Sequence, residues 1–135
     1  MADLSITAAN VLAASGAEKN RATAGAAITA GQVIYILSTD SKAYLADDTT
    51  AVKAAARGVA LNNAAIGQPV TYISAGDFNP GAAVAVGLIY GVTDTPGGIG
   101  LVSERASADF VTVLGIATTT SNIHLSINRS GYAIA

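Results

Sequence analysis

His124 is the only histidine in the sequence, and its imidazole is the side chain best suited to acid–base chemistry. The sequence has no cysteine and no second histidine, so His124 has neither a thiol nucleophile nor another imidazole as a metal co-ligand. No serine lies in a Gly-x-Ser-x-Gly turn, although a Ser–His–Asp triad is recognised by geometry and stays open at this point. His124 alternates with apolar neighbours, on the same expected face as Asn122 and Ser126. We therefore expect an exposed or interface histidine, and no catalytic residue.

Carboxylates are the next candidates for chemistry. Paired carboxylates could serve a glycosidase, and Asp40 or the pair Asp47 and Asp48 could hold a divalent cation. Asp47 and Asp48 stand just before a segment with helical character, where capping explains acidic residues more simply. We expect no metal site and no cofactor, and leave open whether a cation binds near Asp47 and Asp48.

The glycine-rich turns are candidates for phosphate binding. They contain neither a Gly-Lys-Ser/Thr sequence nor a Gly-x-Gly-x-x-Gly that opens a helix. In 94–98, Pro96 followed by Gly97 is typical of the central positions of a type II turn. We expect this turn to reverse the chain between two strands.

Composition and charge narrow the classes of partner. Nine acidic and seven basic residues give a net charge of −2, with no basic run to follow a phosphate backbone. Five tyrosines, two phenylalanines and no tryptophan supply few platforms for base stacking. The uncharged stretches 22–39, 58–76 and 78–93 are interrupted by polar residues, Gly or Pro, which argues against membrane spans. We expect no direct nucleic-acid partner, no membrane partner and, without a visible signal peptide, a product made in the cytoplasm.

Short alternating segments dominate the chain. In 122–128, Ile123, Leu125 and Ile127 alternate with polar residues, which predicts a strand with one buried face. The segment 110–116 is apolar on both faces and predicts a central strand, paired with 122–128 as a hairpin. Further strands are predicted at 3–7, 32–38, 43–46, 58–62, 69–74, 84–92 and 99–103.

These elements predict one all-β domain over residues 1–135. The expected architecture is a jelly-roll-like β-sandwich or a barrel of short strands. One short helix is expected at about 48–57, from the acidic residues Asp47 and Asp48 ahead of its first turn, Lys53 and Arg57 in its last turn, and Gly58 after it. Residues 8–24 show little periodicity and are interpreted as an extended N-terminal arm or long loop.

Several blocks resemble a known family of small virion proteins. They are the opening residues 1–11, the block 24–35, the block 58–64 with 67–70, and the blocks 94–99 and 111–117, in this order along nearly the whole chain. In these blocks the sequence resembles the capsid cement, or head decoration, proteins of tailed phages. The resemblance implies a jelly-roll-like β-sandwich on the outside of an HK97-type phage head, made in the host cytoplasm. It carries no catalytic residues.

The resemblance implies the major capsid protein as partner, with the protein bridging neighbouring capsid subunits. We also expect self-association as a homodimer, with a homotrimer as the alternative. The expected contact residues lie in the arm and in the apolar tail 131–135, and are Glu18, Lys19, Arg21, Tyr132 and Ile134. We expect deletion of either segment to leave the domain folded.

Three other functions stay open from sequence. A tail- or fibre-associated virion module would share this composition. A small carbohydrate-binding β-sandwich is less well supported, because such sites usually need exposed aromatic platforms. An enzyme is the third class, and the sequence offers it no convincing acid–base pair.

Overall fold

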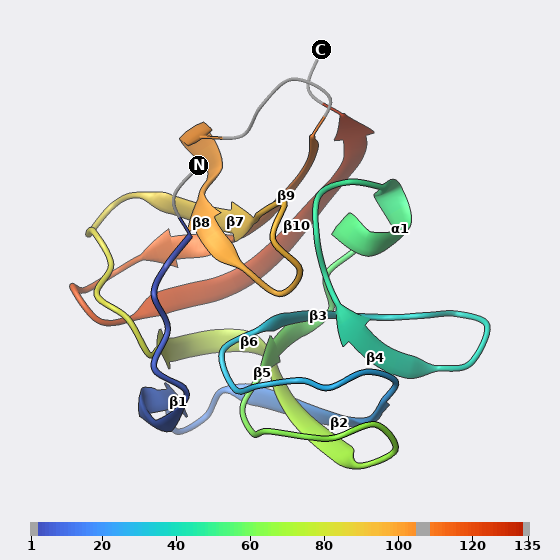
Figure 1. Ribbon diagram of the computed structural model, residues 1–135. Coiled ribbons are helices and arrows are strands. Elements are labelled where there is room, and N and C mark those ends of the chain that lie inside the picture. The colour runs from blue at the N-terminus through green and yellow to red at the C-terminus, as the bar shows by residue number, and fades with distance from the viewer. Residues whose placement is uncertain (1–2, 105–108, 134–135) are drawn as a thin grey trace.

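A computed structural model describes residues 3–104 and 109–133 and has an all-β fold, with 48% of residues in strands and 8% in helical turns. Figure 1 shows the ten strands in two groups that share the long strand β6. The strands are β1 (Val11–Ala13), β2 (Glu18–Ala24), β3 (Val33–Ile36), β4 (Lys42–Leu45), β5 (Gly58–Ala60), β6 (Pro69–Pro80), β7 (Ile89–Val92), β8 (Ile99–Leu101), β9 (Phe110–Ala117) and β10 (Ile123–Ala133). The α-helix α1 (Ala51–Ala54) and the 3-10 turns η1 (Ala8–Asn10) and η2 (Val102–Glu104) complete the described elements. The prediction of an all-β fold is confirmed.

One group of strands closes into a small barrel. Its order is β2–β4–β3–β5–β6, and β6 pairs back to β2. All of its pairings are antiparallel except β2 with β4, which is parallel. The interior is filled by aliphatic side chains, half of the cluster being alanine, with Tyr72 as its one aromatic residue. Alanine-rich strands can close so tightly because their inward side chains take little space.

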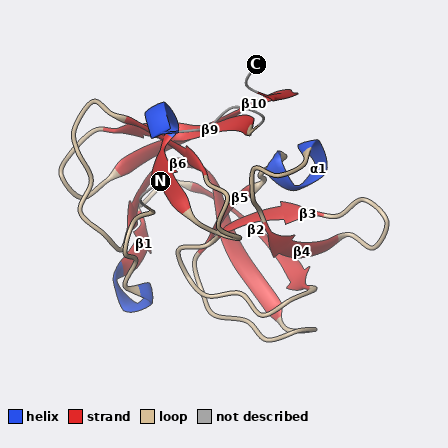
Figure 2. Ribbon diagram, turned by 45° about the horizontal axis from the view of Figure 1, so that its top comes forward, coloured by secondary structure: helices blue, strands red, loops and turns tan. Residues whose placement is uncertain are grey.

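The other group forms a larger antiparallel sheet in the order β1–β6–β10–β9–β7–β8. Figure 2 shows this sheet beside the barrel, with β6 running between them. The second hydrophobic cluster fills the space between the two, and Phe78, Ile73 and Leu114 in it are fully buried. The molecule is therefore sandwich-like between its two groups and barrel-like within one of them.

The strand β6 belongs to both groups because it bends in the middle. Gly76 has a φ of +106°, which disfavours any side chain, and the register slips between the pairs Glu18–Ala75 and Lys19–Ile73. A Cβ on Gly76 would also lie 3.0 Å from Cα of Ala17. The strand predicted over 69–74 therefore continues past the glycine, which bends it rather than ending it.

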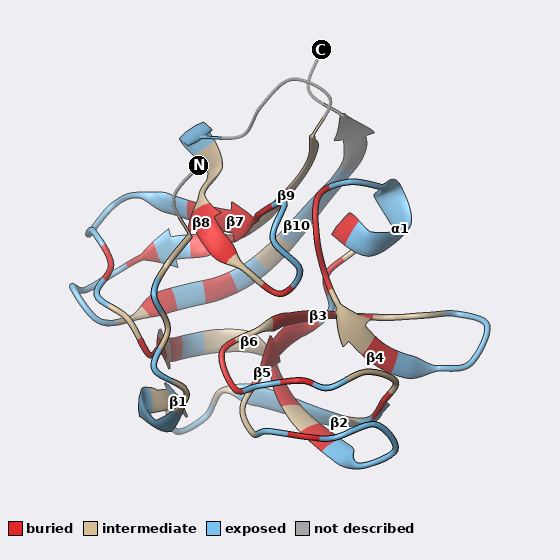
Figure 3. Cartoon of the chain, in the orientation of Figure 1, coloured by how far each residue is buried: buried red, intermediate tan, exposed pale blue. Residues whose placement is uncertain are grey.

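The predicted arm at 8–24 is wrong as a description of local structure. Residues 11–13 and 18–24 form β1 and β2, which pair with β6, and β2 closes the barrel. The weak periodicity has a physical cause, since β2 is exposed on both faces along most of its length (Figure 3). Deletion of 8–24 would remove a barrel strand, so from the structure we expect this deletion to destabilise the domain.

Two other predicted elements differ in detail. Residues 3–7 form no strand, although Leu4 N donates to Ile99 O (2.8 Å) and continues the larger sheet beyond β8. The helix is present but shorter than predicted, and Thr50 is its N-cap, since its Oγ1 accepts from Lys53 N (3.2 Å). The turn between β7 and β8 is confirmed, because Gly97 has a φ of +80° and Gly98 N donates to Thr95 O (2.8 Å).

Candidate interaction surfaces

The structure does not bring together the four predicted contact residues that lie within the described ranges. Glu18, Lys19 and Arg21 lie on β2 with exposed side chains. Tyr132 lies near the end of β10, and Ile134 lies outside the described residues. The end of β10 pairs with the beginning of β9, and Figure 1 shows this end and β2 at opposite ends of the molecule. The four described residues therefore lie on two separate parts of the fold.

The two faces of β2 differ in their chemistry. Glu18 Oε1 accepts from Ser74 Oγ (2.9 Å), and Asn20 Nδ2 donates to the same hydroxyl (2.9 Å), so these side chains are held against β6. Lys19 and Arg21 alternate with them and point to the other face. Within residues 3–104 and 109–133, neither cation takes part in an ion pair. Their charges are available to a partner.

A row of directly paired residues crosses the outer face of the larger sheet. Ile89 pairs with Ile116, Ile116 with His124, and His124 with Asp77. Paired residues on adjacent strands share a face, so the four side chains form one continuous row. Ile89 and Ile116 are 44% and 48% exposed, which is high for large aliphatic residues directly opposite each other.

Half-buried valines extend the apolar end of this row. Val113 pairs with Gly91 on the same face, and Val102 lies over Gly91 from the edge of the sheet. We call the set formed by Ile89, Val102, Val113 and Ile116 the β7–β9 apolar patch. A hollow of about 330 Å³ adjoins it, lined in part by Leu88 and Leu101. Contiguous exposed apolar residues of this kind mark protein contact sites.

The polar end of the row is an exposed hydrogen-bonded pair. His124 Nδ1 lies 2.7 Å from Asp77 Oδ1, and the two side chains are 58% and 48% exposed. The prediction that His124 points outward is confirmed. An exposed pair of this kind contributes little to stability, so its main effect is to fix the imidazole beside the β7–β9 apolar patch.

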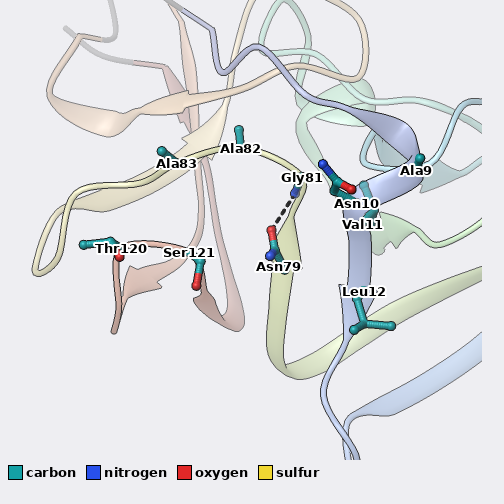
Figure 4. Close-up of a pocket in the computed structure, with 10 residues that line it drawn as sticks. All are labelled: Ala9, Asn10, Val11, Leu12, Asn79, Gly81, Ala82, Ala83, Thr120 and Ser121. Carbon is teal, nitrogen blue, oxygen red and sulfur yellow. Dashed lines mark hydrogen bonds between the residues drawn. The ribbon is translucent and has the colours of Figure 1, made fainter.

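A groove of about 640 Å³ lies between η1, β1, the loop after β6 and the turn between β9 and β10 (Figure 4). Its polar groups include Asn10, Asn79, Thr120 and Ser121. Asn79 Oδ1 already accepts from Gly81 N (2.8 Å), as the dashed line in Figure 4 shows. The groove contains no ionisable side chain among its lining residues in the described part of the chain. It offers shape and hydrogen bonds rather than charge.

Electrostatic coupling is clearest at the turn between β3 and β4. Tyr44 donates its hydroxyl to Asp40 Oδ2 (2.6 Å), and Lys42 N donates to Asp40 Oδ1 (3.0 Å). The Tyr44 hydrogen bond, with the smaller effects of Lys42, lowers the pKa of Asp40. The same hydrogen bond to a carboxylate raises the pKa of Tyr44. This pair orders the turn.

The carboxylates considered for a cation occupy other roles or places. Asp47 is buried, and its Oδ1 accepts from both N and Oγ1 of Thr49, so it shapes the chain ahead of α1. Asp48 is fully buried, and Asp40 lies at the exposed turn. Across the described ranges, no three His, Asp or Glu side chains gather as a metal site would need.

Neither the protein-family models nor the curated proteins match this chain. No helix in the described part of the chain is long and apolar enough to cross a membrane.

Sequence reasoning misses the β7–β9 apolar patch, although its signal is present. The segment 110–116 is apolar on both faces, which predicts central burial. β9 is indeed central, since it pairs with β10 and β7. One of its faces nevertheless has no layer over it at Ile116 among the described residues, and pairing within a sheet does not reveal which face is covered.

Proposed function

We propose that this protein is a structural virion component, a capsid cement protein bound to the outside of an HK97-type phage head. In this role it bridges neighbouring subunits of the major capsid protein and stabilises the shell. The ordered sequence blocks that resemble cement proteins support the proposal. The all-β fold is compatible with it, and the proposal includes self-association as a homodimer, or alternatively a homotrimer.

The observation that carries the proposal is the β7–β9 apolar patch. It lies on an open sheet face where Ile89 and Ile116 are directly paired and both nearly half exposed. The thermodynamic cost of hydrating two such side chains is removed when a partner covers them. We assign the patch to the contact with the capsid surface.

A bridging protein needs more than one contact surface. The cationic side of β2 lies in the barrel, away from the apolar patch on the larger sheet (Figure 1). Shared packing through β6 connects the two, so force on one surface is transmitted to the other. Repetition on a symmetric shell makes many weak contacts collectively strong.

Cosedimentation with matching capsids stripped of the protein tests the proposal. Wild-type protein should saturate at hundreds of copies per shell, an order of magnitude set by the repeated lattice. Ile89→Asp/Ile116→Asp should lower occupancy at least about tenfold, because two carboxylates would be desolvated at the contact. Thr118→Asp/Thr119→Asp, on the exposed turn after β9, adds the same charge and should bind normally. Thermal unfolding of each variant verifies that it is folded.

The number and position of bound copies distinguish the cement role from the alternative functions. Saturation at a single vertex would assign the protein to the tail or a fibre. No binding by folded wild-type protein would reject the cement role. Sedimentation equilibrium of the free protein tests the homodimer, and a monomer at all concentrations would reject self-association in solution.

A further inference from the structure

The outer edge of β2 is open along most of its length. On one side, β2 pairs with β6 from Glu18 to Thr23. On the other side it pairs with β4 only at Thr23 and Ala24. No described strand pairs with this outer edge between Glu18 and Ala22. An unpaired strand edge of this kind can template another strand.

Hydrogen bonds on β6 show which main-chain groups face this edge. Thr71 N donates to Asn62 Oδ1 (2.7 Å), and Thr71 O accepts from Leu61 N (2.8 Å), so both groups point away from β2. Arg21 is paired with Thr71 and therefore belongs to a pair without mutual hydrogen bonds. Its N–H and C=O point outward, and so do those of Lys19, two residues earlier.

Two cations thus flank the free hydrogen-bonding groups. The side chains of Lys19 and Arg21 are both exposed, share one face, and have no ion-pair partner within the described ranges. Lys42 lies beside them on the same face, because it pairs with Thr23. Its neighbour Asp40 is already held by the Tyr44 hydroxyl.

This arrangement disfavours a second copy of the same edge. Two antiparallel copies could exchange hydrogen bonds only through their outward residues, which are Lys19 and Arg21 in each. Every such register places a cation directly opposite a cation, and like charges opposite each other destabilise a sheet. The carboxylates of an acidic strand would instead be attracted to Lys19 and Arg21.

We propose that the β2 edge binds an extended acidic segment of a partner protein, which adds to the barrel as an antiparallel strand. The segment carries carboxylates two residues apart, one opposite Lys19 and one opposite Arg21. Main-chain hydrogen bonds to these two residues supply affinity, and the alternating charges fix the register. The inference stands on the edge alone and does not depend on the capsid role.

Peptide binding, followed by fluorescence anisotropy at low salt, tests it. The probe is labelled Thr-Thr-Glu-Thr-Glu-Thr-Thr, blocked at both ends, and its isomer Thr-Thr-Thr-Glu-Glu-Thr-Thr has the same charge without the alternation. N-methylation of the two Glu amides removes the N–H groups that would face β2. N-methylation of the two Thr residues that follow them leaves these groups in place and is the matched control.

The alternating probe should bind about tenfold more tightly than its isomer. Methylation at Glu should weaken binding about tenfold more than methylation at Thr. Lys19→Glu/Arg21→Glu should abolish binding, whereas Lys53→Glu/Arg57→Glu, the same charge change at exposed cations near α1, should retain it. Equal affinity for the two isomers would show that the site only attracts negative charge, and this would overturn the proposal. Equally tight binding of a short single-stranded oligonucleotide would show the same. No binding up to millimolar probe would also overturn the proposal.

Discussion

At the residue scale, the pair Asp40 and Tyr44 links local order to pH. The lowered pKa of Asp40 means that its contribution to stability is present above the ordinary value of 3.8 and is lost as the pH falls through the folded-state pKa. The raised pKa of Tyr44 has the opposite sense, so its contribution is present below 10.0 and lost as the pH rises through the folded-state value. Between the folded-state pKa values of Asp40 and Tyr44, the hydrogen bond from the Tyr44 hydroxyl to the Asp40 carboxylate is intact.

Tyr44→Phe should therefore raise the pKa of Asp40 toward 3.8, because the hydroxyl that stabilises the carboxylate is its largest perturbation. A titration of the Asp40 carboxyl carbon by NMR measures the change directly. Tyr35→Phe is the matched control, since its ring lies 6.0 Å from that of Tyr44 and the hydroxyl that reaches Asp40 belongs to Tyr44. An unchanged Asp40 titration in Tyr44→Phe would show that the turn, not the hydroxyl, sets this pKa.

At the element scale, one buried hydroxyl connects the only described α-helix to the sheet. Thr112 on β9 is 2% exposed, and its Oγ1 donates to Ala54 O at the end of α1. Ala56 N also donates to this carbonyl (2.8 Å), so the group is not left unpaired when the hydroxyl is removed. Thr112→Val should then lower the free energy of unfolding by about 1 kcal/mol. Urea unfolding measures it, with Thr118→Val on the exposed turn as a control that should change little.

Predictability from sequence also differs by element. Strands with one buried face, such as β10, are predictable because their period of two is visible. β2 escapes prediction because both of its faces are exposed and its sequence has no alternation to read. The predicted β6 stops short of Gly76, since a glycine that bends a strand and one that ends it look alike in sequence. The helix is predicted in the right place but too long, because the acids before it shape a turn and Thr50 is the cap.

The candidate surfaces follow the same logic. The charges of Lys19 and Arg21 are visible in the sequence, and their exposure is confirmed. Their outward main-chain groups depend on Thr71 bonding to Asn62 and Leu61, residues far from β2 in the chain, and no local pattern encodes that. The pairing of Ile89 with Ile116 likewise depends on register between distant strands.

The charge pattern of the β2 edge yields a prediction about single substitutions. In Lys19→Glu, an antiparallel pair of copies could place the new carboxylate opposite Arg21 of the other copy, twice by symmetry. This variant should associate further than wild type in sedimentation equilibrium. Lys53→Glu has the same net charge and should not. Lys19→Glu/Arg21→Glu should not associate either, because it opposes carboxylates, and association of all three variants would contradict the register.

At the scale of the whole molecule, stiffness comes from sharing a strand. β6 contributes to the barrel and to the larger sheet, and the main hydrophobic cluster contains residues of both. A contact on β7 or β9 and a contact on β2 are therefore held at a fixed separation by packed core rather than by a linker. Such a body resists being stretched between two attachment points, as a bridging role requires.

A bridging role also predicts that one variant can still bind the capsid without stabilising it. If the β7–β9 apolar patch is one of two attachment points, Ile89→Asp/Ile116→Asp can still bind through the other at high concentration. Capsids loaded to equal occupancy with wild type or this variant should then differ in rupture temperature, because only wild type connects neighbouring subunits. Heating the two preparations and following DNA release by dye fluorescence measures this. Equal rupture temperatures at equal occupancy would mean that the patch supplies affinity alone and that the load between subunits passes through another surface.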